Sequence, residues 1–475
     1  MKSQVSLSLR PVQLGGFTLE AMSFCILFLV TGCAVGPAYQ RPSAPEVAAY
    51  KEAGNWVVAA PLDALERGPW WELFNDPVLN DLAARVEVSN QNVVAAVAAY
   101  AQARALVAEQ RAGLFPSVNL GGGTSRAQSS SNTRNNYQAS LGASWEPEVW
   151  GRLQIAANGA AAAVSASAAD LATARLAAQG ELTVNYLSLR QQDAQTALLA
   201  SALAGYVRAL EIAQNRYTAG VVAKTDVLQA QTQLANARAD QAGLQRTRAQ
   251  LEHAIAVLAG QAPGNFTLPA EALWKPSVPD VPVGVPSTLL QRRPDIAAAE
   301  RRVASANAQI GLAKAAYYPS LGLNASVGTS ASRVAQLFSA PAAVWSLGVS
   351  AAQVLFDGGA RDARVDAATA VRDQTVARYR QVVLSAFQNV EDQLTGVRVL
   401  QTQQVLRSQA TSAADQVEQQ VLNRYRSGQV SYTEVITAQT TALNARRALV
   451  QATADRQTTA VALIQALGGG WVPAQ

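Results

Sequence analysis

Apolar and polar residues alternate along four stretches of this chain. The clearest are residues 137–146, 320–328 and 345–352, and a shorter, glycine-rich stretch begins at Ser117. In each stretch every second side chain is apolar, and the side chains between them are mostly small and polar. Such strands, about ten residues long, are typical of transmembrane β-sheets, where one face meets lipid and the other lines an aqueous lumen. The pattern predicts four such strands with a polar external loop at 125–133, and it leaves open a soluble sheet packed on helices.

Helical periodicity dominates the rest of the chain. Mostly apolar residues recur every seven positions through residues 182–217 and 237–258, which is the spacing of a coiled-coil seam. Residues 148–262 and 342–472 contain no proline, so nothing in these tracts forces a helix to break. A helix over residues 159–215 would be 57 residues long, or about 85 Å. The sequence therefore predicts very long helices.

Two glycines mark the points where these helices turn back. Gly220 and Gly428 directly follow predicted helices, and glycine readily adopts the left-handed conformation that ends a helix. After the second turn, Ser431 and Glu434 have the spacing of a capping box, in which each side chain accepts a hydrogen bond from the other residue's backbone N–H. We therefore predict two helical hairpins.

The second half of the chain repeats the first. Residues 215–220, Asn-Arg-Tyr-Thr-Ala-Gly, return at residues 423–428 as Asn-Arg-Tyr-Arg-Ser-Gly, so that the offset is 423 − 215 = 208. Earlier in each half, residues 115–120 match residues 318–323. A duplication of this length indicates two copies of a structural unit of about 200 residues, each combining a strand pair with long helices.

The N-terminus resembles a bacterial lipoprotein signal. Lys2 and Arg10 precede an apolar run at residues 24–30, which is too short to span a bilayer as a helix. Thr-Gly-Cys then ends at Cys33, the pattern of a lipobox, whose cysteine is acylated (with palmitate among the acyl groups) and becomes the new N-terminus. We predict that Cys33 is lipidated; the alternative is an ordinary buried cysteine after a cleaved leader.

Two details refine this prediction. Ala34, in place of an aspartate, follows the cysteine, which in such lipoproteins indicates transfer to the outer membrane. Met1 and Met22 are both possible starts, and Met1 is favoured because a start at Met22 would lack the basic residues of a signal peptide. One acyl anchor is a weak membrane tether, so a second element should hold the protein in the bilayer.

Proline positions and the repeat together divide the chain into segments. Seven of the 19 prolines fall between Pro263 and Pro294, so this region is predicted to be an extended linker. The predicted segments are a lipoprotein signal peptide at 1–32, an N-terminal periplasmic segment at 33–75, a first repeat at 76–262, the linker at 263–290, a second repeat at 291–469, and a C-terminal tail at 470–475.

Composition argues against several classes of protein. Hydrophobic residues make up 49% of the 475 residues but aromatic residues only 6%, and small apolar side chains suit close helix–helix contact. The formal net charge of +5 is spread along the chain without a basic stripe, so no nucleic-acid partner is predicted.

Residues that carry catalysis or bind metals are sparse. His253 is the only histidine, which excludes histidine-based metal clusters and Ser/His triads. Glycines 121–123 follow a predicted strand, but no helix follows them, so a phosphate-binding loop is not predicted. Trp70 and Trp71 are interpreted as packing residues. We predict no catalytic residue, no metal and no cofactor.

Four strands in one chain have a consequence for assembly. They cannot close a barrel alone, and open sheet edges are not tolerated in lipid. Three copies would supply about twelve strands, so the membrane interpretation predicts a homotrimer in contact with outer-membrane lipid.

Short motifs are spread over the chain from residue 33 to about residue 469. They are Cys33-Ala34-Val35-Gly36-Pro37-Ala38-Tyr39 with Arg41-Pro42, Trp70-Trp71-Glu72-Leu73-Phe74 with Asp76-Pro77, Arg293-Pro294-Asp295-Ile296 leading to Ala299-Glu300, Tyr318-Pro319-Ser320-Leu321, and Phe356-Asp357-Gly358-Gly359. Together they resemble the TolC/OprM family of outer-membrane efflux channels (outer membrane factors), in its NodT-like lipoprotein branch.

The resemblance implies a mixed α and β fold, in which a trimeric outer-membrane β-barrel continues into a long periplasmic α-helical barrel. It implies docking to a periplasmic adaptor (membrane fusion) protein and, through it, to an inner-membrane pump that supplies the energy. The function would be the exit channel of a tripartite, RND-type efflux system for drugs or other small solutes. One rival is an exit duct for type I protein secretion. A rival from another class is a structural, envelope-spanning coiled-coil lipoprotein, which would not need lipid-length strands.

In this family the periplasmic end of the duct is closed by helix ends held together by hydrogen bonds and ion pairs. By resemblance, the corresponding aperture candidates here are Thr225, Asp226, Tyr425 and Glu434. For Asp226 and Glu434 the alternative is a structural role, a favourable charge or cap at a helix N-terminus worth about 1 kcal/mol. The two roles are compatible.

The chain departs from the family near the predicted aperture. Val430 and Thr437 stand where relatives carry charged or acidic residues, which weakens the case for a double ring of carboxylates. Lys224, beside the first tip, is a further aperture candidate that would pair with an acid.

Overall fold

The computed structural model describes residues 35–45, 49–53, 69–129, 132–279, 281, 292–339 and 342–469. The predicted signal peptide, the lipidation site Cys33, linker residues 280 and 282–290, and the predicted C-terminal tail lie outside the described residues. The chain divides into two compact units. The sheet unit comprises residues 105–162 and 304–373 with the N-terminal residues up to 40; the helical unit comprises 41–104, 163–303 and 374–475.

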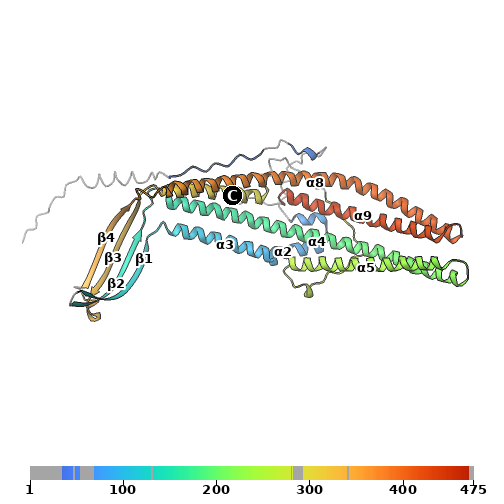
Figure 1. The fold of residues 1–475 in the computed structure, drawn as a ribbon, viewed down its shortest axis with the longest axis horizontal. Coiled ribbons are helices and arrows are strands. Elements are labelled where there is room, and N and C mark those ends of the chain that lie inside the picture. Colours follow the sequence, from blue (N-terminus) through green and yellow to red (C-terminus); the bar gives the residue numbers. More distant parts are fainter. Residues whose placement is uncertain are drawn as a thin grey trace, which may run out of the picture. The chain divides into compact units, whose positions relative to one another are not determined.

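The sheet unit contains four antiparallel strands in the order β1-β2-β3-β4 (Figure 1). They are β1 (Ser117–Ser129), β2 (Asn132–Trp145), β3 (Ser320–Ala331) and β4 (Ala343–Ala352). The prediction of four strands, two in each repeat, is confirmed. Because β2 and β3 lie side by side, the strand pairs of both repeats form one sheet.

One face of this sheet is mostly apolar, with the polar residues Thr124, Arg126 and Gln128 at one end of β1. Leu120, Leu141, Val327 and Trp345 lie in register across all four strands, and Trp345 is 80% exposed. The opposite face carries small polar residues, which side chains alternating along a strand place there. An exposed apolar surface of this extent marks a surface that meets lipid or another protein.

Two predictions about the first strand pair are wrong. Residues 125–133, predicted as an external loop, are mostly strand, since β1 and β2 pair continuously from Ser117 with Ser144 to Ser129 with Asn132. Glycines 121–123 lie inside β1 and do not follow it. The cause is the backbone ladder with β2, which holds a polar, glycine-rich segment extended despite its low intrinsic strand propensity.

The internal repeat is visible in the helix boundaries. Helices α8 (Ala360–Arg426) and α9 (Tyr432–Ala466) have the same lengths as α4 (Arg152–Thr218) and α5 (Lys224–Leu258), and each begins and ends 208 residues later. Upstream, α3 (Gln91–Ala112) and α7 (Pro294–Ala315) also have equal lengths, but their offset is 294 − 91 = 203. The offset changes at the strands, where the β3–β4 connection is the longer one and contains the short helix η4 (Val334–Gln336).

Two helical hairpins, α4 with α5 and α8 with α9, dominate the helical unit (Figure 1). By length and composition α4 is the one described helix that could cross a membrane. However, Leu182, Leu189 and Leu199 of α4 are completely buried within the helical unit, so its apolar seam is part of a protein core. The predicted heptad seam of α4 is confirmed except at its last residue, Tyr217, which is exposed.

Shorter elements complete the helical unit. They are η1 (Lys51–Ala53), η2 (Trp70–Phe74), α2 (Pro77–Ser89) and η3 (Pro263–Asn265). Trp70 and Trp71 are buried and meet edge to face with their ring centroids 5.9 Å apart, so their interpretation as packing residues is confirmed. The first part of the predicted linker is not a free tether, because Phe266 and Leu268 are buried.

Candidate functional site

The two hairpin tips have the same backbone geometry. Gly220 and Gly428 both have φ +74°, as predicted. In the first tip the N–H of Gly220 donates to the carbonyl of Tyr217 at 2.9 Å, and the N–H of Val221 donates to the carbonyl of Arg216 at 2.8 Å. The second tip has the equivalent pair of bonds. This is a Schellman motif, which satisfies the last carbonyls of a helix when a left-handed residue follows it.

The helices that restart after the tips are capped differently. Before α9, the Ser431 side chain accepts from the Glu434 N–H at 3.4 Å and the Glu434 side chain accepts from the Ser431 N–H at 3.4 Å, so the predicted capping box is confirmed. The N-cap of α5 is Ala223, whose side chain makes no cap hydrogen bond. Asp226, the repeat equivalent of Glu434, therefore contributes only a favourable charge in the first turn of α5.

The five aperture candidates all lie in the first turns of α5 and α9 or in the last turn of α8. Lys224, Thr225 and Glu434 are exposed, and Asp226 and Tyr425 are half-buried. In the part of the chain that the structure describes, no ion pair involves Lys224, so the expected pairing with an acid is not formed within a single chain.

Tyr425 is the candidate with the most contacts. Its ring lies 5.7 Å from the ring of Tyr432 at the start of α9, and the Arg216 guanidinium lies over it, 5.2 Å from the ring centroid. A cation over an aromatic face is attracted by the ring quadrupole. Because Arg216 comes from α4 and Tyr425 from α8, this contact joins the two hairpins.

Tyr432 and Arg216 were not among the predicted site residues. Tyr432 is buried in an apolar cluster that joins the two tips, together with Ala213, Val227, Ala230 and Val435. Burial, followed by the charge effects of Tyr425, Tyr206 and Asp226, raises the pKa of Tyr432 to about 12. The repeated Asn-Arg-Tyr motif was the sequence signal that could have pointed to Arg216.

Polar contacts extend this junction along α5 and α9. The Gln233 side chain donates to Thr440 Oγ1 at 3.2 Å, and the Arg447 guanidinium donates to Asp240 at 3.1 Å. These contacts hold the hairpins of the two repeats side by side. The face that the first hairpin contributes is not the repeat equivalent of the face that the second hairpin contributes.

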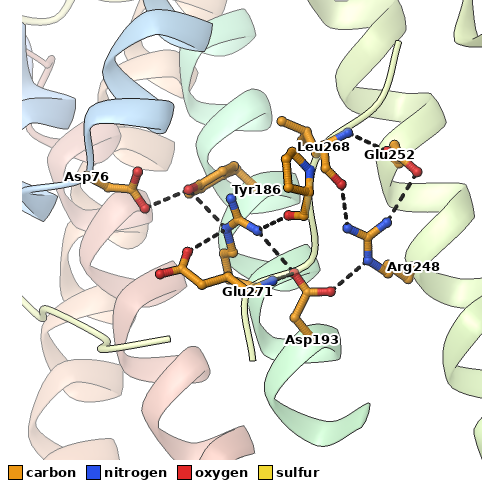
Figure 2. Close-up of polar contacts among 9 residues, drawn as sticks. Asp76, Tyr186, Asp193, Arg248, Glu252, Leu268 and Glu271 are labelled. Atoms are coloured by element: carbon orange, nitrogen blue, oxygen red, sulfur yellow. Dashed lines mark hydrogen bonds and ion pairs between the residues drawn. The ribbon is translucent and has the colours of Figure 1, made fainter. Parts of the chain in front are cut away.

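A second polar cluster lies away from the tips, and its central residues Tyr186, Arg190 and Asp193 are buried. It is the linker-binding network, made by Asp76, Tyr186, Arg190, Asp193, Arg248 and Glu252 with residues 268–271 of the linker (Figure 2). Arg190 donates to the Pro269 carbonyl at 2.8 Å and Arg248 donates to the Leu268 carbonyl at 2.7 Å. These contacts attach the linker to α4 and α5.

The same network reaches the start of α2. One oxygen of Asp76 caps α2 by accepting from the Val78 and Leu79 N–H groups, and the other accepts from the Tyr186 hydroxyl at 2.6 Å. Burial, followed by the hydrogen bond to Asp76, raises the pKa of the Tyr186 hydroxyl. The network is therefore a structural junction of three segments far apart in the sequence.

The repeat equivalents of its two arginines bind another non-repeated segment or a neighbouring helix. Arg398, equivalent to Arg190, forms an ion pair with Glu52 of η1, and Arg456, equivalent to Arg248, donates to Gln404. Each repeat thus uses one arginine at the same position to hold a connecting segment against its long helix.

Comparison with known proteins decides the family. The family model described as outer membrane efflux protein matches residues 82–261 and 285–469. The chain belongs to the outer membrane efflux protein family. This confirms the family that the motifs resembled, and it makes transport across the outer membrane the function of the protein, since the family is one of channels.

Individual relatives agree with this assignment. The toluene efflux pump outer membrane protein TtgC of Pseudomonas putida is 30% identical over 456 residues, which cover 94% of each chain. The pyoverdine export outer membrane protein OpmQ of Pseudomonas aeruginosa is 30% identical over 470 residues, covering 95% of this chain and 97% of that one. The structure of the outer-membrane channel OprN is similar with a TM-score of 0.82 and 30% identity, over 92% of this chain and 100% of that one.

Proposed function

We propose that three copies of this efflux channel close one β-barrel in the outer membrane and act as the exit duct of a tripartite efflux system. The observation that carries the proposal is the sheet. Among the described strands, β1 and β4 each have one unpaired edge, and an open edge is not tolerated in lipid. Pairing of β4 in one copy with β1 in the next removes every open edge when the ring closes.

The strand faces support insertion into a bilayer. The strands are 10 to 14 residues long, and about 9–11 residues suffice for a tilted strand to cross the hydrocarbon core. The apolar row through Leu141 and Trp345 would meet lipid. The opposite face would line the lumen, where Ser326 and Ser346 share a hydrogen bond of 2.8 Å.

The hairpin tips are the proposed periplasmic aperture. Thr225, Asp226, Tyr425 and Glu434 lie there, with Lys224 beside them, so they can act on the opening. A periplasmic adaptor protein and, through it, an inner-membrane pump would be the partners. The predicted acyl chain on Cys33 would be a second attachment to the membrane.

Small solutes are the proposed substrates. Relatives of the same identity carry names that refer to toluene and to pyoverdine, two chemically different compounds. These names favour solute efflux over type I protein secretion, and we infer that the pump mainly selects the substrate.

The barrel is tested by paired arginine substitutions on neighbouring residues of β4. Leu347→Arg puts a charge on the lipid-facing side, which costs about 2–4 kcal/mol near the bilayer midplane. Gly348→Arg puts the same charge on the other face, where no atom of the described residues lies within 4 Å of the added Cβ. We expect Leu347→Arg alone to lower the amount of protein in the outer-membrane fraction. Equal loss for both variants would contradict the assignment of faces.

Assembly and transport are measured separately. Native mass spectrometry of the full-length protein in detergent should give a trimer, and a monomer would overturn the barrel proposal. Accumulation of toluene-like solvents, dyes and antibiotics should rise in a deletion strain and fall when the gene is restored on a plasmid. Unchanged accumulation of every solute, together with a protein missing from the spent medium, would instead identify a secretion duct.

A further inference from the structure

The two residues that join the hairpins within one chain have repeat equivalents on the other faces of the hairpins, and no such contact joins those equivalents within the described residues. Within one chain Arg216 lies over the ring of Tyr425, and both are half-buried. The repeat offset of 208 relates Arg216 to Arg424 and Tyr425 to Tyr217, so the same two residue types recur in exchanged positions. Arg424 is exposed, and Tyr217 is 45% exposed.

The apolar surroundings repeat in the same way. Ala209 and Ile436 pack against the cluster that joins the tips, and their repeat equivalents are Val417 and Leu228. Val417 is 52% exposed and Leu228 is 50% exposed. Large apolar side chains therefore stand uncovered at the positions that are covered where the two hairpins meet within the chain.

Two repeats that pack through different faces always leave one face of each unused. On the first hairpin, the face that is equivalent to the one used by the second hairpin stays free. On the second hairpin, the face that is equivalent to the one used by the first hairpin stays free. A second copy of the chain fits this arrangement, because its first hairpin can pack on the free face of the second hairpin. Such head-to-tail contacts form a closed ring when the rotation allows it.

We propose that Arg424 of one copy packs over the Tyr217 ring of the next copy at the hairpin tips. This rests on the proposed trimeric channel, in which three such copy–copy seams alternate with three seams inside the chains. The occupant of the exposed face is then a second copy of this protein, recognised by the same cation–ring contact that joins the hairpins within one chain.

The copy–copy seam differs from the seam inside the chain at the position of the second ring. Tyr425 has Tyr432 as its second ring, whereas the repeat equivalent of Tyr432 is Lys224. Tyr217 would therefore have Arg424 over it and Lys224 beside it, two positive charges that repel each other. The seam between copies is the weaker one, and an opening force at the tips would separate the copies first.

Cross-linking tests the contact in the full-length protein. The variant with Tyr217→Cys and Arg424→Cys is treated with a short bismaleimide, since an arginine over a ring leaves the backbones too far apart for a direct disulfide. We expect covalent dimers and trimers on denaturing gels. The matched control, Arg216→Cys with Tyr425→Cys, should cross-link within one chain and stay at monomer mass. The parent chain, with Cys25 and Cys33 as its only cysteines, is treated in parallel.

The outcomes separate this proposal from the proposed function. A native trimer in which the first variant gives no more cross-linked species than the parent chain would overturn the Arg424–Tyr217 contact and leave the channel intact. A native monomer would instead overturn the channel proposal itself. Cross-linked species above the parent level, confined to the variant that pairs Tyr217 with Arg424, would support the contact.

Lys224→Tyr tests the weakness of the seam. It would give Tyr217 the second ring that Tyr425 already has, and it removes one of the two positive charges. We expect the temperature at which the trimer dissociates in detergent to rise, and the single-channel conductance in a planar bilayer to fall. Dissociation at the same temperature as the parent would show that Lys224 does not weaken the seam.

Discussion

Arg190 donates a hydrogen bond to Asp193 at 3.1 Å, one turn further along α4, and both side chains are almost fully buried. Asp193 also accepts from Arg248 at 2.7 Å and from the Glu271 N–H at 3.1 Å. One carboxylate thus connects α4, α5 and the linker. Removing a partner from a buried ion pair is costly because it leaves the other charge uncompensated.

Asp193→Ala should destabilise the linker-binding network by about 3–5 kcal/mol, the usual effect of breaking a buried ion pair. The measurement is native-state hydrogen exchange of the linker amides. The Glu271 N–H loses its acceptor and should exchange much faster, whereas the Leu268 N–H keeps its bond to Glu252.

Arg208→Ala is the matched control on the same helix. Arg208 pairs with Glu211 at 3.4 Å with the same spacing of three residues, but both side chains are exposed. An exposed pair contributes about 0–1 kcal/mol, so the linker amides should keep their exchange rates. Similar acceleration in both variants would mean that burial does not set the importance of Asp193.

The features that the sequence predicted are those with local or repeating causes. The offset of 208, found from one short repeated motif, holds at both ends of both long helices of each hairpin. The positive φ of Gly428 and the capping box of Ser431 depend only on residues a few positions apart. Strand alternation is also local, which is why the apolar face of the sheet was correctly predicted.

The features that the sequence did not predict depend on distant segments. Asp76, Tyr186 and Glu271 belong to one network only because the linker returns to α4, and no periodicity records that path. The partners of Tyr425 were missed for the same reason. Lys224 was expected to pair with an acid, but no ion pair involves it among the described residues, and its repeat equivalent, Tyr432, packs against the ring of Tyr425.

The predicted lipid anchor gives a prediction about membrane attachment. Cys33→Ser should prevent acylation while the protein still inserts, because in the proposed barrel the strands would hold it in the bilayer and one acyl chain adds only a weak tether. Metabolic labelling with a clickable palmitate analogue reports acylation, and carbonate extraction of membranes reports insertion. Recovery of unacylated protein in the soluble fraction would contradict the assignment of the strands to lipid.

The tip glycines give a prediction about backbone conformation. Gly428→Ala should destabilise the second hairpin by about 1–2 kcal/mol, since a side chain disfavours the left-handed conformation. In the part of the chain that the structure describes, no atom lies within 4 Å of the added Cβ, so the cost comes from φ alone. Gly205→Ala is the control, because Gly205 is equally unobstructed but lies inside α4, where alanine is favoured over glycine by about 1 kcal/mol. Thermal unfolding should shift in opposite directions for the two variants.

Glu434 and Asp226 are repeat equivalents in unlike surroundings, and this separates capping from gating. Glu434→Ala removes one half of the capping box and should cost about 1 kcal/mol, whereas Asp226→Ala removes only a first-turn charge, worth about 0.3–1 kcal/mol. Thermal unfolding should therefore shift more for Glu434→Ala. If Glu434 also holds the aperture closed, the single-channel conductance of that variant rises in a planar bilayer. Lower thermal stability with unchanged conductance would assign Glu434 to capping alone, and the aperture would then depend on the contacts between the hairpins.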